Sequence, residues 1–429
     1  MKIYTEPVRA LWNEIARRPE KNEKMIQETV NSILDDVKKR GDEALFFYTK
    51  VLDGAKLNGF GVDIKTIKES GRFLDEKLKE AISLAATNIE KFHKAQIVSD
   101  VDIITSPGVR CIQRRLPLKR VGLYVPGGSA PLFSTVLMLG IPAKVAGCKE
   151  IVLFTPPNKL GEVNPAILFA AGYLGIEEIY TIGGAQAIGA MAYGTESINK
   201  VDKIFGPGNS FVAFAKQAIC KDVAVDMFAG PSELMVIADE TANPVFVAAD
   251  LLSQAEHGKD SQVFLVASCS TVAEKCINEI EKQSAKLNRQ KEIAGTLEKS
   301  ISIILEKREN MIEFANIYAP EHLIISTVDP WGIANKIEAA GSIFIGNYSP
   351  ESAGDYASGS NHTLPTGGWA KSQGGLSLDS FTHTISYQEI TREGIDNLSS
   401  AIEIMASAEG LEAHRNAVTV RMEEQKNGY

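Results

Sequence analysis

The fold is decided by residues 121–154, which read VGLYVPGGSAPLFSTVLMLGIPAKVAGCKEIVLF. This stretch begins with a short run of β-forming residues that ends in a Pro-Gly-Gly cluster, and it continues with a helix-like segment. A second β-rich run follows at 150–154. Because strands joined by a crossover helix lie parallel in one sheet, the stretch predicts a βαβ unit.

The same rhythm continues beyond this stretch. Further β-rich runs occupy residues 178–182 and 203–205, and each is followed by glycine or proline and then by a helix-like segment. The starts of these runs lie roughly 25 to 30 residues apart, the length expected of a βαβ unit. A second series occupies residues 233–238, 262–267 and 342–345. The repetition predicts an α/β fold with two parallel-sheet layers, the first centred on residues 121–230.

Both flanking parts of the chain are predicted to be helical. Residues 22–94 are charged, and their apolar residues recur at helical spacing, as in Val30, Leu34 and Val37. A polar tail from about residue 377 also carries a helical apolar pattern, and Gly410 interrupts it. The most basic stretch, residues 110–120, alternates with apolar residues and is interpreted as a solvated strand face.

The bulk composition favours a globular cytoplasmic protein. The chain has 429 residues, of which 44% are hydrophobic and 23% charged. A formal net charge of -9 argues against a nucleic-acid surface, which needs clustered cations. No apolar run approaches the ~18 residues that span a bilayer, and the first residues lack a signal-peptide core. The five cysteines show no C-x-x-C spacing, which favours reduced thiols.

Gly- and Pro-rich clusters follow the predicted strands at 126–128, 183–184 and 206–209. In open parallel sheets, ligands bind beyond the C-terminal ends of the strands, and a helix start there favours an anion. The G-x-G-x-x-G fingerprint of dinucleotide-binding folds is absent. Since glycines also make ordinary tight turns, the clusters alone leave nucleotide binding and plain turns equally open.

The chain has only six histidines, and four of them lie beside carboxylates or amides. In residues 243–258, Asn243 and Pro244 predict a helix start and Gly258 its end. Gln254 and His257 would then share one helix face, which suits a metal ion. The alternative is a histidine that is simply favoured by the dipole at a helix C-terminus.

A second context, residues 319–325, reads APEHLII. Glu321 and His322 immediately precede an apolar strand, and catalytic groups often lie at such loop–strand junctions. The imidazole of His322 titrates near neutral pH and could act as a base, while Glu321 could activate water. An exposed, solvated pair is the alternative interpretation.

The remaining two contexts are a loop and a helix break. Residues 351–362 form a long loop rich in small residues, and it carries Asp355 and His362. Residues 408–414 read AEGLEAH, where Gly410 would let Glu409 and His414 converge. Each could be a plain surface segment. Taken together, Gln254, His257, Asp355 and His414 offer nitrogen and oxygen ligands without cysteine, which suits a catalytic zinc with open positions.

Eight segments resemble those of the histidinol dehydrogenase family. They are GLYVPGGSAPLFSTVLMLGIPA, TIGGAQAIGAMAYGT, IFGPGNSFV, VDMFAGPSELMVIADE, ADLLSQAEHG, YAPEHL, GDYASGSNHTLPT and AEGLEAH. They are long, occur in order, and run from about residue 121 to residue 414. The resemblance implies a zinc-dependent, NAD-linked enzyme that oxidises L-histidinol through L-histidinal to L-histidine, the last steps of histidine biosynthesis.

The resemblance also implies roles for single residues. One zinc ion per subunit would be bound by Gln254, His257, Asp355 and His414. His322 resembles the catalytic base, and Glu321 resembles the residue that activates water. Contacts to the substrate are implied for these zinc ligands and His322, and further for Ser232, His362 and Glu409. Contacts to NAD are implied for Tyr124, Gln186 and Asn209.

The family's fold implies two incomplete Rossmann-like domains. The first α/β domain is expected to comprise residues 23–120 and 232–376 and to carry the zinc and catalytic residues, and the second, 121–231, to carry the NAD loops. Residues 1–22 would form an N-terminal helical segment and 377–429 a helical tail. The family forms homodimers in which this tail crosses over, so Glu409 and His414 are expected to complete the partner's site.

One position departs from the family pattern. Ser360 stands where the family often has proline before Asn-His. Losing the fixed φ of proline is expected to loosen the loop that carries His362, with a modest effect on substrate affinity.

Three other functions compete with this interpretation. A zinc-dependent hydrolase of a small amino compound would use Glu321 and metal-bound water without NAD. A thiol-using aldehyde dehydrogenase would need an accessible cysteine of low pKa, and no cysteine lies beside a histidine or in the glycine-rich loops. A binding module without catalysis would need neither Glu321 nor His322.

Overall fold

A computed structural model of the chain describes residues 1–19, 23–127, 131–227 and 230–426. The chain divides into two compact units, one of Met1–Gln96 with Leu118–Phe381 and one of Ile97–Pro117 with Thr382–Tyr429. The first unit contains two parallel sheets, and the second contains an antiparallel one. Gly128, which belongs to a predicted glycine cluster, lies outside the described residues.

The first parallel sheet has five strands in the order β6-β5-β4-β7-β8. Along the chain they are β4 (Arg120–Tyr124), β5 (Glu150–Phe154), β6 (Glu178–Tyr180), β7 (Lys203–Phe205) and β8 (Ala224–Val225). Counted in chain order, the arrangement is 3-2-1-4-5, so the strand order reverses between β4 and β7. In sheets of this kind the ligand crevice opens beyond the strand ends at that point.

Side chains alternate between the two faces of β4, because successive residues of a strand point to opposite sides. Val121 and Leu123 pack with α5 (Glu76–Lys94), α6 (Phe133–Ala146) and α7 (Pro165–Tyr173). Tyr124 packs on the other face with α2 (Glu23–Arg40), α3 (Asp42–Tyr48), α8 (Gly184–Tyr193) and α9 (Ser210–Ala218).

The helices α2, α3 and α5 therefore pack with the sheet of residues 121–231, whereas the family resemblance implied that residues 23–120 belong with residues 232–376. The helix α5 contributes Ile82, Ala85 and Ile89 to one core, and α2 contributes Val30, Leu34 and Val37 to the other. The short helix α4 (Ile64–Glu69) lies against α7. Both long helices show the predicted helical periodicity.

The second parallel sheet has six strands in the order β1-β11-β10-β9-β12-β13. They are β1 (Lys2–Thr5), β9 (Glu233–Ala238), β10 (Gln262–Ala267), β11 (Ile301–Ile304), β12 (His322–Ser326) and β13 (Ser342–Ile345). Among the strands from β9 to β13, the strand order again reverses, here between β9 and β12. All residues of β9, β10 and β12 are buried, as expected of parallel strands covered on both faces.

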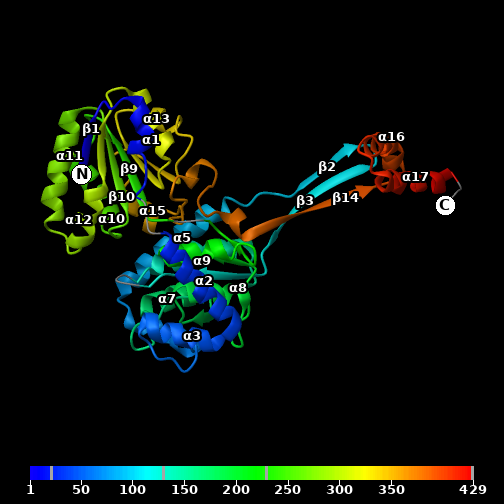
Figure 1. Cartoon of the computed structure of the whole chain (residues 1–429), viewed down its shortest axis with the longest axis horizontal. Helices are drawn as coiled ribbons and strands as arrows, with labels where there is room; N and C mark the ends of the chain where they lie inside the picture. The colour runs from blue at the N-terminus through cyan, green and yellow to red at the C-terminus, as the bar shows by residue number, and fades with distance from the viewer. Residues whose placement is uncertain (20–22, 128–130, 228–229, 427–429) are drawn as a thin grey trace. The chain divides into compact units, whose positions relative to one another are not determined.

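Two groups of helices cover this sheet (Figure 1). One face carries α10 (Pro244–Ala255), α11 (Ser270–Ser284) and α12 (Gln290–Lys299). The other carries α1 (Trp12–Ile15), α13 (Arg308–Tyr318) and α14 (Pro330–Ala334). The short helix α15 (Glu351–Tyr356) follows β13 and contacts α10.

The second unit is an antiparallel sheet followed by two helices. Its strands are β2 (Val101–Ser106), β3 (Val109–Pro117) and β14 (Thr382–Ile390), with β3 in the middle. The helices are α16 (Arg392–Ala408) and α17 (Glu412–Lys426), separated at Gly410, whose φ is +73°. The basic strand predicted at 110–120 and the break at Gly410 are confirmed. The tail is not helical from residue 377, because β14 pairs with β3 over its nine residues.

The predicted fold class, an α/β fold with two Rossmann-like parallel sheets and a helical C-terminal tail, is confirmed. The seven predicted strands of the two series are present, although β6 ends at Tyr180 rather than at residue 182. The expected helical segment of residues 1–22 is wrong for Lys2–Thr5, which form β1 and pair with β11. Among the described residues, no helix is both long and apolar enough to cross a membrane.

Candidate active site

Glu321 and His322 lie at the start of β12, in the interior of the six-stranded sheet. β12 lies between β9 and β13, and His322 pairs in register with Leu234 and Ser342. The two side chains are almost fully buried, since only 6% of Glu321 and 3% of His322 is exposed. The alternative of an exposed, solvated pair is therefore wrong. Burial of two ionisable groups requires partners, and these partners define the site.

The ring of His322 is held in one tautomer. Its Nδ1 lies 3.3 Å from the carbonyl oxygen of Glu233, and a carbonyl can only accept a hydrogen bond. Nδ1 therefore carries the proton, and Nε2 is left with its lone pair. Nε2 is buried and has no hydrogen-bond partner within the described chain. Burial lowers the pKa of His322 to about 3, so the ring is neutral at physiological pH.

Two carboxylates of α15 approach the same imidazole. Glu351 Oε1 lies 3.2 Å from Nδ1, and Asp355 Oδ1 lies 3.7 Å from Nε2. One ligand atom from each of these two residues and one from His322 lie within 4.8 Å of one another, a spacing that could hold a metal ion. Burial raises the pKa of Asp355 to about 7. Burial, and then the charge of Asp355, raises the pKa of Glu351 well above its usual range.

Glu321 is anchored by the same residue that holds His322. The backbone N–H of Glu233 donates to Oε2 of Glu321 at 2.8 Å, so the backbone of Glu233 binds both members of the pair. Burial raises the pKa of Glu321 well above its usual range, and the nearby charge of Glu233 adds to the effect. A carboxyl group with a raised pKa is a stronger proton acceptor when it is ionised.

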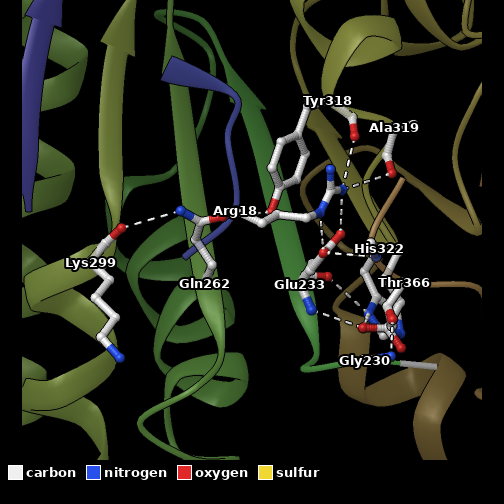
Figure 2. A network of polar contacts seen from close by, with 11 residues as sticks. Arg18, Gly230, Glu233, Gln262, Lys299, Tyr318, Ala319, His322 and Thr366 are labelled. Atoms are coloured by element: carbon white, nitrogen blue, oxygen red, sulfur yellow. Dashed lines mark hydrogen bonds and ion pairs between the residues drawn. The ribbon is translucent and has the colours of Figure 1, made fainter. Parts of the chain in front are cut away.

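Glu233 is in turn fixed by an arginine from the N-terminal segment (Figure 2). Arg18 forms a bidentate ion pair with the Glu233 carboxylate, and its Nη2 lies 2.7 Å from Oε2. The guanidinium also stacks on the ring of Tyr318 and donates to the carbonyl oxygen of that residue. The Glu233 carboxylate accepts a further bond from the backbone N–H of Gly367 at 2.9 Å. This network joins four segments that are distant in the chain, and it contacts Glu321 and His322 through Glu233.

His362 lies close to Asp355, as the loop motif predicted. Its Nδ1 is 3.0 Å from the backbone oxygen of Asp355, and its Nε2 is 3.3 Å from the hydroxyl of Thr135. Burial lowers the pKa of His362 to about 4. Ser360, the departure from the family pattern, lies 3.3 Å from Ser358 through their hydroxyls.

Gln254 and His257 come from the C-terminal end of α10. Asn243 caps this helix and Pro244 occupies its first turn, both as predicted. The helix ends at Ala255, however, so His257 lies beyond it, and the prediction that both residues share one helix face is wrong. Gln254 is completely buried, and neither atom of its amide has a partner among the residues described. Its neighbour Ser253 donates to Glu351 at 3.4 Å, which ties α10 to α15.

Two cavities contain the other predicted residues. A cavity of about 1530 Å³ at the carboxyl edge of the five-stranded sheet is lined by Tyr124, Gln186 and Asn209, the three expected NAD contacts. A smaller cavity of about 310 Å³ is lined by Asn209, Ser232 and His257. Asn209 borders both, so residues expected at the nucleotide and residues expected at the substrate meet there.

The profile of the histidinol dehydrogenase family matches residues 16–422 of the chain. The chain belongs to the histidinol dehydrogenase family. The histidinol dehydrogenase of Bacteroides fragilis is 53% identical over 425 residues, which are 99% of each chain. That of Bacteroides thetaiotaomicron is 50% identical over 423 residues, 98% of this chain and 99% of the relative.

A solved structure supports the same assignment. The histidinol dehydrogenase of Elizabethkingia anophelis has a TM-score of 0.96 to this chain at 49% identity, with 99% of each chain covered. The predicted family membership is confirmed. Like other histidinol dehydrogenases, the chain is an NAD-linked oxidoreductase.

Two predicted residues of the histidinol dehydrogenase site lie in the second unit. Glu409 directly follows α16, and His414 lies in the first turn of α17. Both are exposed. They are thus available to a partner, and their part in the site remains a prediction.

Sequence reasoning missed Glu351, Glu233 and Arg18. Glu351 lies four residues before Asp355, so its position on the same helical face could have drawn notice once a helix was assumed there. Glu233 acts on the catalytic pair largely through its backbone, which no side-chain pattern reveals. Arg18 is more than 200 residues away from Glu233 in the chain, and nothing in its local sequence indicates the ion pair.

Proposed function

We propose that the chain oxidises L-histidinol to L-histidine in two steps at one site, with L-histidinal as the intermediate. The balanced reaction consumes one L-histidinol, one water and two NAD, and it yields L-histidine, two NADH and three protons. The observation that carries the proposal is the paired arrangement of His322 and Glu321, a neutral base with a free nitrogen beside a carboxyl group of raised pKa.

His322 is proposed as the base of both oxidations. A carbonyl oxygen holds its Nδ1 proton, so Nε2 can take the hydroxyl proton of the alcohol and later that of the hydrate. The backbone of Glu233 fixes the ring, so the base keeps its orientation while the substrate changes from alcohol to hydrate. Holding the reacting groups in place makes each transfer effectively unimolecular.

Glu321 is proposed to activate the water that adds to the aldehyde. Its ionised carboxylate takes a proton from water as the oxygen bonds to the aldehyde carbon. The raised pKa favours that transfer. Because the pair is almost fully buried, the aldehyde has limited access to bulk solvent before it is hydrated.

The donor set near His322 suits a zinc ion. Gln254 offers a buried amide with no partner in the described part of the chain, a state that is costly unless a ligand occupies it. Asp355 offers an oxygen and His257 a nitrogen, both of which are ordinary zinc ligands. When bound, zinc would hold the imidazole and amino groups of the substrate. Because Asp355 lies next to His322, a substrate held at the zinc would have its reacting carbon near that base.

The large cavity is proposed to bind NAD, which takes up the hydride of each step. Gln186 lines it with a completely buried amide, and neither atom of that amide is bonded within the described residues. Tyr124 contributes a hydroxyl that accepts a bond from the backbone N–H of Gly184 at 3.0 Å. Asn209 lies at the border with the small cavity, where Ser232 is proposed to contact the substrate. His362 is proposed as a further substrate contact.

The chain is proposed to act as a cytoplasmic homodimer. Glu409 of the partner subunit would then contact the substrate, and His414 of the partner subunit would supply the fourth zinc ligand. The second unit exposes large apolar side chains, which favours association with another surface. They include Ile103, Ile104, Ile404 and Met405.

The decisive measurement is the yield of NADH from limiting L-histidinol. We expect two equivalents per substrate, and we expect a chelator to abolish turnover and added zinc to restore it. One equivalent would show that the reaction stops at the aldehyde. No turnover by the zinc-loaded enzyme with NAD would remove the proposed reaction altogether and favour a hydrolase.

A further inference from the structure

One carboxylate in the proposed NAD cavity has no role in the reaction described above. Asp53 is the last residue of a short π-helical turn, Thr49–Asp53, and it lines the same cavity as Tyr124 and Gln186. Its Oδ2 is buried without a hydrogen-bond partner in the described ranges. Burial raises the pKa of this carboxyl to about 6, and its charge acts on Tyr124. A carboxylate oxygen that is buried without a partner favours a donor from a ligand.

The chain that follows Asp53 is fixed to the carboxyl edge of the sheet. Thr181 donates to the carbonyl oxygen of Phe60 from its backbone N–H at 2.8 Å and from its hydroxyl at 2.9 Å. Val62 donates to the carbonyl oxygen of Ile179 at 2.9 Å. These bonds attach the segment at the end of β6, the third strand of this sheet in chain order. Asp53 therefore belongs to a segment that is bonded to the sheet next to β6. This is the side of the strand reversal on which β5 and β6 lie.

This side of a Rossmann sheet ordinarily binds the adenosine half of a dinucleotide. An acidic residue after the second strand usually binds the adenosine ribose there. In this chain the second strand is β5, and it is followed by Thr155, Pro156 and Pro157, none of which is acidic. Thr155 also has a buried hydroxyl without a bond to any described residue, and it lines the same cavity. The site thus lacks its usual carboxylate, while Asp53 brings one from outside the sheet.

We propose that Asp53 binds the 2′-hydroxyl of the adenosine ribose and thereby selects NAD over NADP. This inference rests on the proposed binding of NAD in the large cavity. The hydroxyl donates to the carboxylate, which supplies the missing partner. The 2′-phosphate of NADP would face the carboxylate as a like charge and has no proton to offer it in its ionised form.

The experiment compares four nucleotides in the zinc-loaded enzyme: NAD, NADP, NAD with a 2′-deoxyadenosine, and NADH as a fluorescent binding probe. For wild type, we expect the 2′-deoxy analogue to lose about ten- to a hundredfold in kcat/KM, as for a hydrogen bond to a charged group. For Asp53→Ala, NAD should lose the same factor, and the 2′-deoxy analogue should lose nothing further. Asp53→Asn should raise the activity with NADP relative to NAD at least tenfold.

Asp63→Asn is the matched control. Asp63 lines the same cavity, but its carboxylate already accepts a bond from the backbone N–H of Lys65 at 2.7 Å, and asparagine can make the same cap. We expect it to leave the preference for NAD unchanged. An equal gain with NADP in this variant would assign the effect to general charge and would overturn the role of Asp53.

A further variant separates the two proposals. If Gln186→Leu weakens NADH binding while Asp53→Ala leaves NAD and its 2′-deoxy analogue equally active, the cavity binds NAD but Asp53 does not read the ribose. If neither variant affects NADH binding, the nucleotide binds elsewhere and the cavity assignment itself fails. Thermal unfolding of each variant checks that lost binding does not reflect lost folding.

Discussion

At the scale of single residues, hydrogen bonding divides the two nitrogens of His322 between two tasks. The acceptors around Nδ1 include a backbone carbonyl, so this nitrogen holds a proton and orients the ring. Nε2 has no partner within the residues described, so it remains available to the substrate. Glu321 shares the anchor of His322 but is proposed to act on water rather than on the substrate hydroxyl, and this difference allows the two half-reactions to be separated experimentally.

We expect Glu321→Gln to slow the oxidation of L-histidinal by a factor of about 100 or more, because a general base contributes about this much. The oxidation of L-histidinol to the aldehyde should slow by less than tenfold. The two rates are measured separately by single-turnover formation of NADH from each substrate. Glu338→Gln, which changes an exposed carboxylate, is the control. Equal slowing of both steps would contradict the assigned role.

Gln254 tests the zinc site without relying on activity. In Gln254→Met a side chain of similar length replaces the buried, unpartnered amide. We expect the zinc content of the purified protein to fall and the affinity to drop by more than the ten- to hundredfold typical of an outer partner. Because the amide has no bond to lose, the metal-free variant should unfold at the same temperature as metal-free wild type or above it. A variant that keeps its zinc would remove Gln254 from the ligand set.

Asp53 is expected to reduce stability at neutral pH. Its pKa in the folded chain is about 6, above its ordinary value of 3.8, so the folded state binds the proton more tightly than the unfolded state. Stability therefore falls as pH rises through the window between these values, and above about pH 6 the loss is complete. Asp53→Asn removes the charge and should stabilise the nucleotide-free protein at pH 8.

The measurement is urea unfolding of wild type and Asp53→Asn at pH 4 and pH 8. The difference between the two proteins should shrink at pH 4, where Asp53 is protonated in the folded wild type. A difference that is the same at both pH values would mean that the carboxylate is well solvated.

At the scale of elements, both sheets reverse their strand order, yet the two sites lie at opposite strand ends. The proposed NAD contacts lie at or beyond the carboxyl ends of β4, β6 and β7, as the general rule for such sheets predicts. Glu321 and His322 instead lie at the amino end of β12, beside the first residue of β9. This placement suits α10, which runs antiparallel to the strands and so brings Gln254 to the amino edge of the sheet.

The distance along the chain between interacting residues decides how much of the fold and of the site the sequence could predict. Period, turn residues and caps predicted most strands of both sheets and the start of α10, because each depends on neighbouring residues. The strands β1, β8 and β11 were not predicted. The end of α10 was placed three residues too late, since Gly258 was taken as its stop. The strand β14 was missed because its partner β3 lies more than 250 residues earlier, and pairing at that distance leaves no local pattern. Arg18 was missed for the same reason, since Glu233 lies 215 residues later in the chain.

The ion pair between Arg18 and Glu233 holds the amino end of β9 in place. Only 4% of the Glu233 side chain is exposed, so removing its partner leaves a buried charge without compensation. We expect Arg18→Met to lower the free energy of unfolding by about 3 to 5 kcal/mol, and to lower kcat because the backbone of Glu233 holds both catalytic residues. The double variant Arg18→Met with Glu233→Gln should recover part of the stability. Denaturant unfolding of Arg18→Met, of Glu233→Gln and of the double variant measures the coupling energy between the two side chains. Additive losses of stability would show that the two side chains are not coupled.

At the scale of the whole molecule, the proposed site is expected to need residues of two subunits. Three of the proposed zinc ligands belong to the first unit and His414 to the second, so the arrangement of subunits decides whether the site forms within one chain or between two. Homodimers with two-fold symmetry exchange equivalent contacts, which gives two shared sites per dimer. Two inactive variants therefore distinguish the possibilities.

We expect His322→Asn and His414→Asn each to be inactive alone, and to recover activity when their subunits are mixed by joint unfolding and refolding. Half of the dimers would then be mixed, and in each of these one site would combine an intact His322 with an intact His414 of the partner subunit. About a quarter of the wild-type activity should return, as expected for random pairing in a two-fold dimer. If both residues served the same subunit's site, every site would keep one defect, and the mixture would be as inactive as its components.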